Sequence, residues 1–224
     1  MKRKLWTLLL ALGAALALCA GASAKTVEND FFEALNVTNG SIKLENYFVF
    51  ENVMEVNHNL TIDLNGHVLT IPKSICVNSG GHLTIIDSNS NAPHRFKPNS
   101  DGLWVLDENG SETVTGGVIT GGTGYQYQKV HPNGEGYTEE AGGAVCVKVG
   151  GSLFMTGGNI VGCSAMSGKG GGVHVEGNFS MTGGSIIGCA ADRGGGVHMA
   201  VGDNESATSV SYTHLRAHET CADL

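Results

Sequence analysis

GGAVCV at residues 142–147 returns as GGGVHV at 170–175 and as GGGVHM at 194–199. Between these copies lies a second repeated phrase, which reads LFMTGGNIVGC at 153–163 and FSMTGGSIIGC at 179–189. Equivalent positions of this second phrase are 26 residues apart. A period of this size predicts stacked repeats that each contact only their neighbours, rather than a globule built around one core.

The repeat begins well before residue 142. Residues 60–64 read LTIDL, and residues 83–87 read LTIID, 23 positions later. Apolar and polar side chains alternate in these phrases, as they do in half-buried strands. Residues 114–121 (VTGGVITG) match 155–162 (MTGGNIVG) at an offset of 41 instead of 26, and the excess is the segment 122–141.

Short alternating strands with glycine corners predict coils of three short strands and three turns. Glycine suits the corners because they need positive φ, which other residues adopt only at a cost. Val145 and Val147 are expected to point inward, with Cys146 pointing outward between them. Coils stacked at the strand spacing of about 4.8 Å would bury a continuous aliphatic column, and roughly six coils give a length of about 30 Å.

The two ends of the chain differ in character from the repeats. Residues 1–24 contain a basic start, an apolar run rich in Leu and Ala, and an A-x-A site, which predicts a secretory signal peptide. Residues 210–220 (VSYTHLRAHET) abandon the repeat pattern and resemble the translation of a sequencing adapter. We therefore interpret 210–224 as a non-native tail and the native sequence as truncated near residue 209.

The amino-acid composition excludes some classes of molecule as binding partners of the protein. Residues 25–209 hold 9 basic and 19 acidic residues, so their formal charge is 9 − 19 = −10. This charge argues against nucleic acid and anionic membranes as partners. The chain holds 34 glycines, yet 41% of it is hydrophobic, which argues against a disordered glycine-rich linker. With the signal peptide, these properties predict an exported protein without a membrane span in its mature part.

The mature chain divides into two parts. Residues 25–56 are expected to form an N-terminal cap and the first coil, with a short capping helix over 26–36. Residues 57–209 are expected to form the stacked repeats, interrupted by inserted loops at 88–112 and 122–141. Long insertions in a solenoid project from one face and often carry binding contacts.

At these residues the chain resembles the right-handed parallel β-helix repeats of bacterial surface proteins. Residues 61–67 (TIDLNGH) resemble an opening coil of that group, and the GGGV phrases resemble repeats of polymorphic outer-membrane proteins and other adhesins. The resemblance covers roughly residues 55–200. It implies an all-β right-handed parallel β-helix (a solenoid) and a cell-surface, adhesin-like role. The group usually has Asn after the Ile-x-Gly step, where this chain has Cys163 and Cys189.

Cys146, His174 and His198 occupy the same slot of the GGxVxV phrase in three successive coils. One hypothesis is that zinc or copper bridges the two histidines, with the cysteine as a third ligand. A flat ladder offers poor tetrahedral geometry, so the interpretation we favour is an exposed ladder of stacked side chains on a strand face.

Cys163 and Cys189 are expected to stack one coil apart. Their Cα atoms would then lie about 5 Å apart, which is within the range of a disulfide. Neighbouring in-register positions on parallel strands rarely present suitable side-chain vectors, so two stacked, partly buried thiols are the preferred interpretation.

The segment 122–141 holds four candidate ligand-binding residues: Tyr125, Tyr127, His131 and Tyr137. Exposed aromatic side chains offer flat apolar area with a polar end, which suits sugars and protein interfaces. The alternative, weighed equally, is that this segment folds back and pads the flank of the column.

A β-helix enzyme acting on carbohydrates would need clustered acidic groups on one face. Asp63 and Asp87 close matching strands, but their position before turns favours a role as turn caps. The Asn-Thr-Asp, Asp-Asp and Arg-Ile-Lys signatures of polygalacturonases are absent from the sequence. We therefore predict no catalytic residues and no cofactor.

These patterns together predict an exported, non-catalytic surface module that presents loops to a glycan or to a host or cell-surface protein. A pectate-lyase-like or other carbohydrate-active enzyme is the alternative, since the same coil is used by such enzymes. A truncated last coil would leave an unpaired strand edge, which favours self-association.

Overall fold

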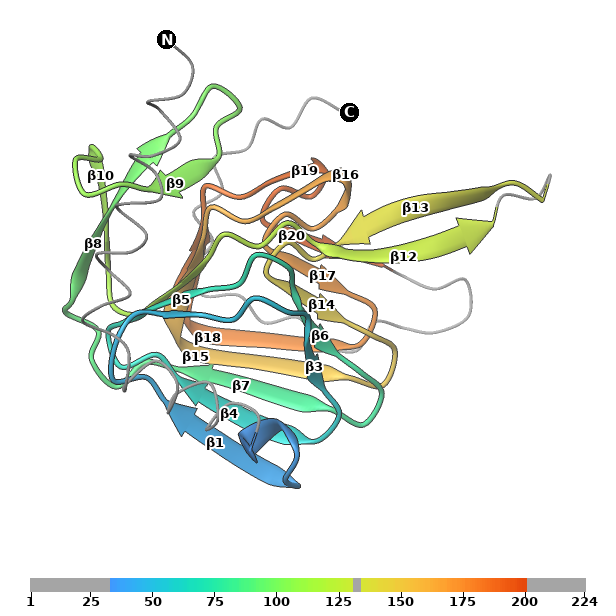
Figure 1. Ribbon diagram of the computed structural model, residues 1–224, viewed down its shortest axis with the longest axis horizontal. Helices are drawn as coiled ribbons and strands as arrows, with labels where there is room; N and C mark the ends of the chain where they lie inside the picture. The colour runs from blue at the N-terminus through green and yellow to red at the C-terminus, as the bar shows by residue number, and fades with distance from the viewer. Residues whose placement is uncertain (1–32, 131–133, 201–224) are drawn as a thin grey trace, which may run out of the picture.

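A computed structural model gives the structure of residues 33–130 and 134–200 (Figure 1). The expected signal peptide at 1–24, the tail at 210–224 and His131 lie outside the described residues. The regular secondary structure of these residues is almost entirely β-strand. No helix in this part of the chain is long and apolar enough to cross a membrane.

Residues 33–35 are α-helical and belong to the expected capping helix, whose earlier residues are not described. Ala34 is buried in the main core, and Leu35 packs against the same core. Gly40, at the start of the first strand, allows this close approach, because a Cβ there would collide with the backbone of Ala34. The helical residues thus cover apolar side chains at this end of the sheets.

Two sheets of parallel strands, A and B, curl around a shared core, and we call the two sheets together the column (Figure 1). Among the described residues, sheet A contains β1 (Asn39–Lys43), β2 (Phe48–Val49), β4 (Asn59–Asp63), β5 (Val68–Thr70), β7 (His82–Ile86), β11 (Val118–Thr120), β15 (Ser152–Val161) and β18 (Asn178–Ile187). Sheet B contains β3 (Met54–Val56), β6 (Ile75–Val77), β14 (Val145–Val147), β17 (Val173–Val175) and β20 (Val197–Met199).

Successive repeats pair in register, as the sequence period predicts. The GGxVxV phrases place β14, β17 and β20 side by side, with Val145 opposite Val173 and Val173 opposite Val197. The strand on the other side of β14 is β6, in which Ile75 lies opposite Val145. The insertions between residues 75 and 145 therefore interrupt the sequence but not the stack.

The main core is aliphatic and receives side chains from both sheets. Burial alternates along the early strands, so that Met54 and Val56 are buried while Glu55 between them is exposed. Further inward-facing residues include Leu60, Ile62, Leu83, Ile85, Val145, Val147, Leu153, Met155, Val173, Phe179 and Met181. Parallel, in-register strands around one core are compatible with a solenoid, although the described strands divide among four sheets rather than one.

The insertion at 88–112 is structured, which corrects the expectation of a loop. It holds β8 (Pro93–Pro98) and β9 (Trp104–Leu106), which pair antiparallel with each other, and β8 also pairs with β10 (Glu112–Thr115) to complete sheet C. The insertion carries apolar side chains of its own. Phe96 is fully buried and joins a second, smaller core with Val114, Val118 and Val161.

The insertion at 122–141 is also structured rather than a loop. β12 (Tyr125–Val130) and β13 (Gly136–Ala141) form an antiparallel hairpin, and β13 pairs in parallel with β16 (Ser164–Lys169), which pairs with β19 (Ala190–Arg193) to complete sheet D. Figure 1 shows this hairpin extending beyond the curled sheets. The hairpin is thus an outgrowth of a sheet that belongs to the stack.

Candidate functional site

The predicted slot of Cys146, His174 and His198 is confirmed as a continuous ladder across sheet B. The register joins Cys76 to Cys146, Cys146 to His174, and His174 to His198. Cys76 is a member that the sequence interpretation missed. The phrase ICV at 75–77 matches VCV at 145–147, so this signal was present in the sequence.

The expectation that this ladder is exposed was wrong. Cys76, Cys146 and His174 are 1%, 0% and 2% exposed, although none of the three belongs to the aliphatic core. We attribute the cover to the hairpin. Lys148, two residues beyond Cys146, places its Nζ 4.6 Å from the ring centroid of Tyr125 and 4.7 Å from that of Tyr127. These contacts hold the aromatic side of the hairpin beside the strand that carries Cys146.

The ladder brings the two histidines together but does not form the predicted three-ligand metal site. The rings of His174 and His198 stack with centroids 5.1 Å apart, and their Nδ1 atoms are 3.2 Å apart. Among the described residues, no three His, Cys, Asp or Glu side chains are arranged to hold a metal ion. Burial, with an added contribution from His174, lowers the pKa of His198.

The two cysteines of the ladder interact directly. A hydrogen bond between Cys76 and Cys146 raises the pKa of Cys146 and lowers the pKa of Cys76. Burial acts to raise the pKa of both thiols, while the Lys148 ammonium acts to lower both values. Cys76 Sγ also donates a hydrogen bond to Asn78 Oδ1 at 3.4 Å.

Cys163 and Cys189 stack one repeat apart as free thiols. The Cys163 N–H donates to Cys189 Sγ at 3.5 Å, and each thiol lies near a backbone carbonyl oxygen of its own strand. Cys163 lies in the aliphatic core and Cys189 packs against it. The arrangement agrees with the preferred interpretation of two stacked thiols.

Asp63 and Asp87 are turn caps, as predicted. Asp63 Oδ1 accepts hydrogen bonds from the backbone N–H groups of Asn65 and Ser88, at 3.0 and 2.9 Å. Asp87 Oδ1 accepts from Gly66 N–H at 2.7 Å, and its Oδ2 accepts from Gly117 N–H at 2.8 Å. Each carboxylate joins backbone segments from different repeats, so both have a structural role.

The aromatic candidates of the insertion 122–141 are only partly available to a ligand. Tyr125 and Tyr127 are half-buried and stack on each other with centroids 6.4 Å apart. The Tyr127 hydroxyl donates to Glu139 Oε2 at 3.2 Å, and Glu139 forms an ion pair of 2.8 Å with Lys169 on β16. These contacts favour the alternative that this end of the hairpin pads the column. Tyr137 is half-buried as well.

An open groove of about 370 Å³ lies where strand β9 of the insertion 88–112 meets the column. Exposed apolar side chains line it, with Tyr47 54%, Val105 49% and Leu106 38% exposed. Four residues with hydroxyl groups also line it: Thr70, Thr120, Thr123 and Ser164. The sequence interpretation did not identify this groove, because the exposure of Tyr47 and of β9 depends on how sheet C docks.

Backbone contacts fix β9 at this position. The Trp104 N–H donates to the Gly188 carbonyl at 2.9 Å. Side chains at Gly162 and Gly188 would collide with Trp104, so the glycines at these two corners leave room for the strand. The Thr70 hydroxyl donates to the Tyr47 hydroxyl at 3.1 Å, which orients the Tyr47 ring at the opposite side of the groove.

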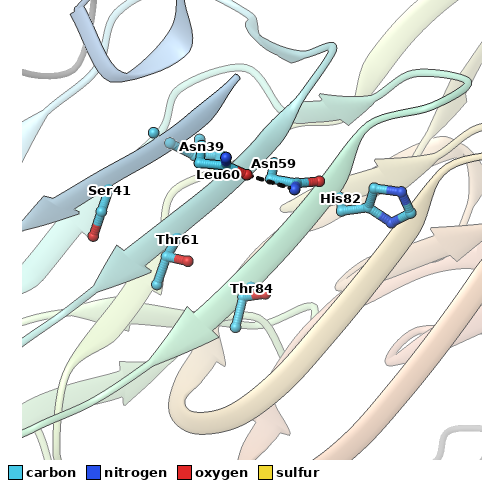
Figure 2. Close-up of a pocket in the computed structure, with 8 residues that line it drawn as sticks. Asn39, Ser41, Asn59, Leu60, Thr61, His82 and Thr84 are labelled. Carbon is cyan, nitrogen blue, oxygen red and sulfur yellow. Dashed lines mark hydrogen bonds between the residues drawn. The ribbon is translucent and has the colours of Figure 1, made fainter. Parts of the chain in front are cut away.

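A second open surface lies on β1, β4 and β7, and Figure 2 shows its side chains in two ranks. Asn39, Asn59 and His82 form one rank, and Ser41, Thr61 and Thr84 form the other. The Asn59 amide donates to Asn39 Oδ1 at 2.7 Å. These six side chains are polar, and the only ring among them is the His82 imidazole, so we interpret this surface as a solvated sheet face.

Comparisons of the chain with protein-family models, with curated proteins and with solved structures give no match. The candidate function therefore depends on the geometry of the chain itself.

Proposed function

We propose that this protein is an exported, non-catalytic surface module whose groove beside β9 binds a glycan. In this proposal the parallel strands form a right-handed parallel β-helix, and the column acts as a rigid support for the two insertions. The groove beside β9 is the observation that carries the proposal.

The chemistry of the groove suits a carbohydrate. The exposed Tyr47 ring offers a flat apolar face on which a sugar ring can stack. Thr120 and Ser164 bring hydroxyl groups to the groove as donors and acceptors, whereas the Thr70 and Thr123 hydroxyls already donate to Tyr47 and to the Pro72 carbonyl and can still accept. A concave site with apolar walls and a few convergent polar groups is the usual form of a small-ligand site.

The charge of the chain restricts the class of glycan. Its formal net charge is −8, and no Lys, Arg or His side chain lines the groove. An anionic sugar would meet an unfavourable field without a cation to bind its carboxylate. The proposed ligands are therefore neutral glycans.

The acidic pair supports a binding role over a catalytic one. Asp63 and Asp87 were the acidic residues that the enzyme alternative could use, and their oxygens accept hydrogen bonds from backbone N–H groups. A general acid or base must be able to reach a substrate proton, and these carboxylates are directed at turns instead.

A glycan array with a matched pair of variants tests the proposal. The full chain should bind one or more neutral glycans. Tyr47→Ala should weaken this binding about 5-fold, because aromatic stacking contributes roughly 1 kcal/mol. Tyr137→Ala removes a tyrosine of the hairpin instead and should leave binding unchanged. Equal binding by wild type and Tyr47→Ala, or loss only with Tyr137→Ala, would exclude the groove.

A further inference from the structure

The thiols of Cys76 and Cys146 form a covered pair outside the aliphatic core. They lie directly opposite each other on β6 and β14, and both are free. Their outward direction follows from the strand alternation, since Ile75, Val77 and Val145 point into the core. A buried pair of thiols on the outer face of a sheet has no packing role in that core.

The space around this pair also contains an unpaired ligand atom. His174, on the next strand, is 2% exposed, and its Nε2 is buried without a hydrogen-bond partner. The nearest acidic oxygen, Glu176 Oε1, is 3.6 Å from Nε2, which is beyond hydrogen-bond distance. Both Glu176 and Lys148 act electrostatically on the two thiols. The thiols and the unsatisfied imidazole nitrogen thus share one covered compartment.

The two thiols are close enough to share one two-coordinate ion. They lie opposite each other on adjacent in-register strands, which are about 4.8 Å apart, and a hydrogen bond joins them. When a metal ion replaces the shared proton, the sulfur atoms must separate to about 4.6 Å, which is two metal–sulfur bonds of about 2.3 Å placed end to end. A tetrahedral ion such as zinc needs four ligands, and no group of even three is arranged for one in the described residues.

We propose that Cys76 and Cys146 bind one soft monovalent metal ion of the Cu(I) class in a two-coordinate site beside the buried imidazole of His174. Thiolates favour soft metal ions, and among these Cu(I) accepts a set of only two ligands. The ion enters as Cu(I), so no electron is transferred, and the two thiol protons leave to solvent as the two sulfur–metal bonds form. The resulting complex carries one negative charge, which the Lys148 ammonium balances.

Cys163 and Cys189 provide a matched control inside the same protein. They have the same stacking relation, one repeat apart. Their sulfur atoms lie at backbone carbonyl oxygens, and they pack in or against the aliphatic core. No side-chain cation is among the groups that act on this pair, so an anionic bis-thiolate complex there would be buried without compensation.

Anaerobic titration with Cu(I) against a chromogenic Cu(I) chelator tests the site. The background protein is the full chain with Cys19→Ser and Cys221→Ser, which leaves the four described cysteines. It should bind one Cu(I), and a Cys163→Ser/Cys189→Ser variant should bind one Cu(I) with the same affinity. Cys76→Ser or Cys146→Ser should reduce the affinity on the order of 100-fold or more, since even outer-shell changes cost up to 100-fold. The proposal would be overturned if the Cys163→Ser/Cys189→Ser variant lost as much Cu(I) affinity as Cys76→Ser or Cys146→Ser. It would also be overturned if the protein bound Cu(I) no more tightly than a small-molecule thiol does.

A second measurement needs no cysteine variant of the pair, so it also applies if those variants fold poorly. The rate at which each buried thiol of the folded background protein is alkylated can be followed by peptide mass spectrometry, with and without one equivalent of Cu(I). Slower alkylation of Cys76 and Cys146 alone in the presence of Cu(I) supports the site, and slower alkylation of Cys163 and Cys189 contradicts it. X-ray absorption should show two sulfur ligands and no nitrogen ligand.

Discussion

Single carboxylates join neighbouring repeats in this protein. Asp63 is the last residue of β4, and it accepts hydrogen bonds from the backbone N–H groups of Asn65 in the next turn and of Ser88 one repeat further on. Burial acts to raise the pKa of Asp63, but these hydrogen bonds, together with Lys43, outweigh it and lower the pKa below the ordinary value of 3.8. The charged form is therefore favoured by folding.

This shift predicts a pH dependence of stability. Because the folded-state pKa is the lower one, Asp63 stabilises the protein fully above pH 3.8, and the contribution is lost as pH falls through the folded-state value. Wild type should have a larger free energy of unfolding in urea than Asp63→Asn, and this difference should shrink as pH falls below about 4. A difference for Asp63→Asn that grows in acid would contradict this assignment.

The hairpin β12–β13 is the element to which we attribute the cover of the Cys–His ladder. Besides the backbone pairing of β13 with β16, its side-chain links to the column include the contacts of Lys148 with Tyr125 and Tyr127 and the ion pair between Glu139 and Lys169. A cation over aromatic rings contributes roughly 0.5–2 kcal/mol, depending on its exposure. The contact with two rings thus stabilises the closed position of the hairpin.

Removing the Lys148 charge should release the hairpin locally. In Lys148→Met, amide hydrogen exchange of residues 125–130 and 136–141 should become roughly 5-fold faster, which corresponds to about 1 kcal/mol. Exchange in β7, at residues 82–86, should not change. Lys97→Met, a matched change on the exposed strand β8, should leave the hairpin unaffected. Equal exchange in the hairpin of wild type and Lys148→Met would show that other contacts hold it.

The sequence predicts these elements unevenly, and the reasons are physical. Repeated phrases pair with themselves, so the 26-residue period predicts the contact of β15 with β18. The insertions carry no repeat, so their strands were missed even though Phe96 and Trp104 supply apolar side chains for a second core. The burial of His174 was missed for the same reason, because we attribute its cover to the hairpin, which carries no repeat.

At the scale of the whole molecule, the column and its insertions have different tasks. The aliphatic core extends from Ala34 to Ile186 through both parallel sheets. The insertions break the sequence between β7 and β14 without breaking the stack, since β7 still pairs with β15 and β6 with β14. Glycine corners and inward aliphatic residues were predictable, whereas the groove arises only when sheet C docks at Gly162 and Gly188.

The groove beside β9 is the basis of the proposed function, and a hydrogen-exchange footprint of the full chain with its bound glycan tests it most directly. The ligand should slow exchange in residues 102–107 and 118–124, which border the groove. Exchange in the hairpin strands 125–130 and 136–141 should be the same with and without the glycan. Protection confined to the hairpin, or no protection at 102–107 at saturating glycan, would contradict the account.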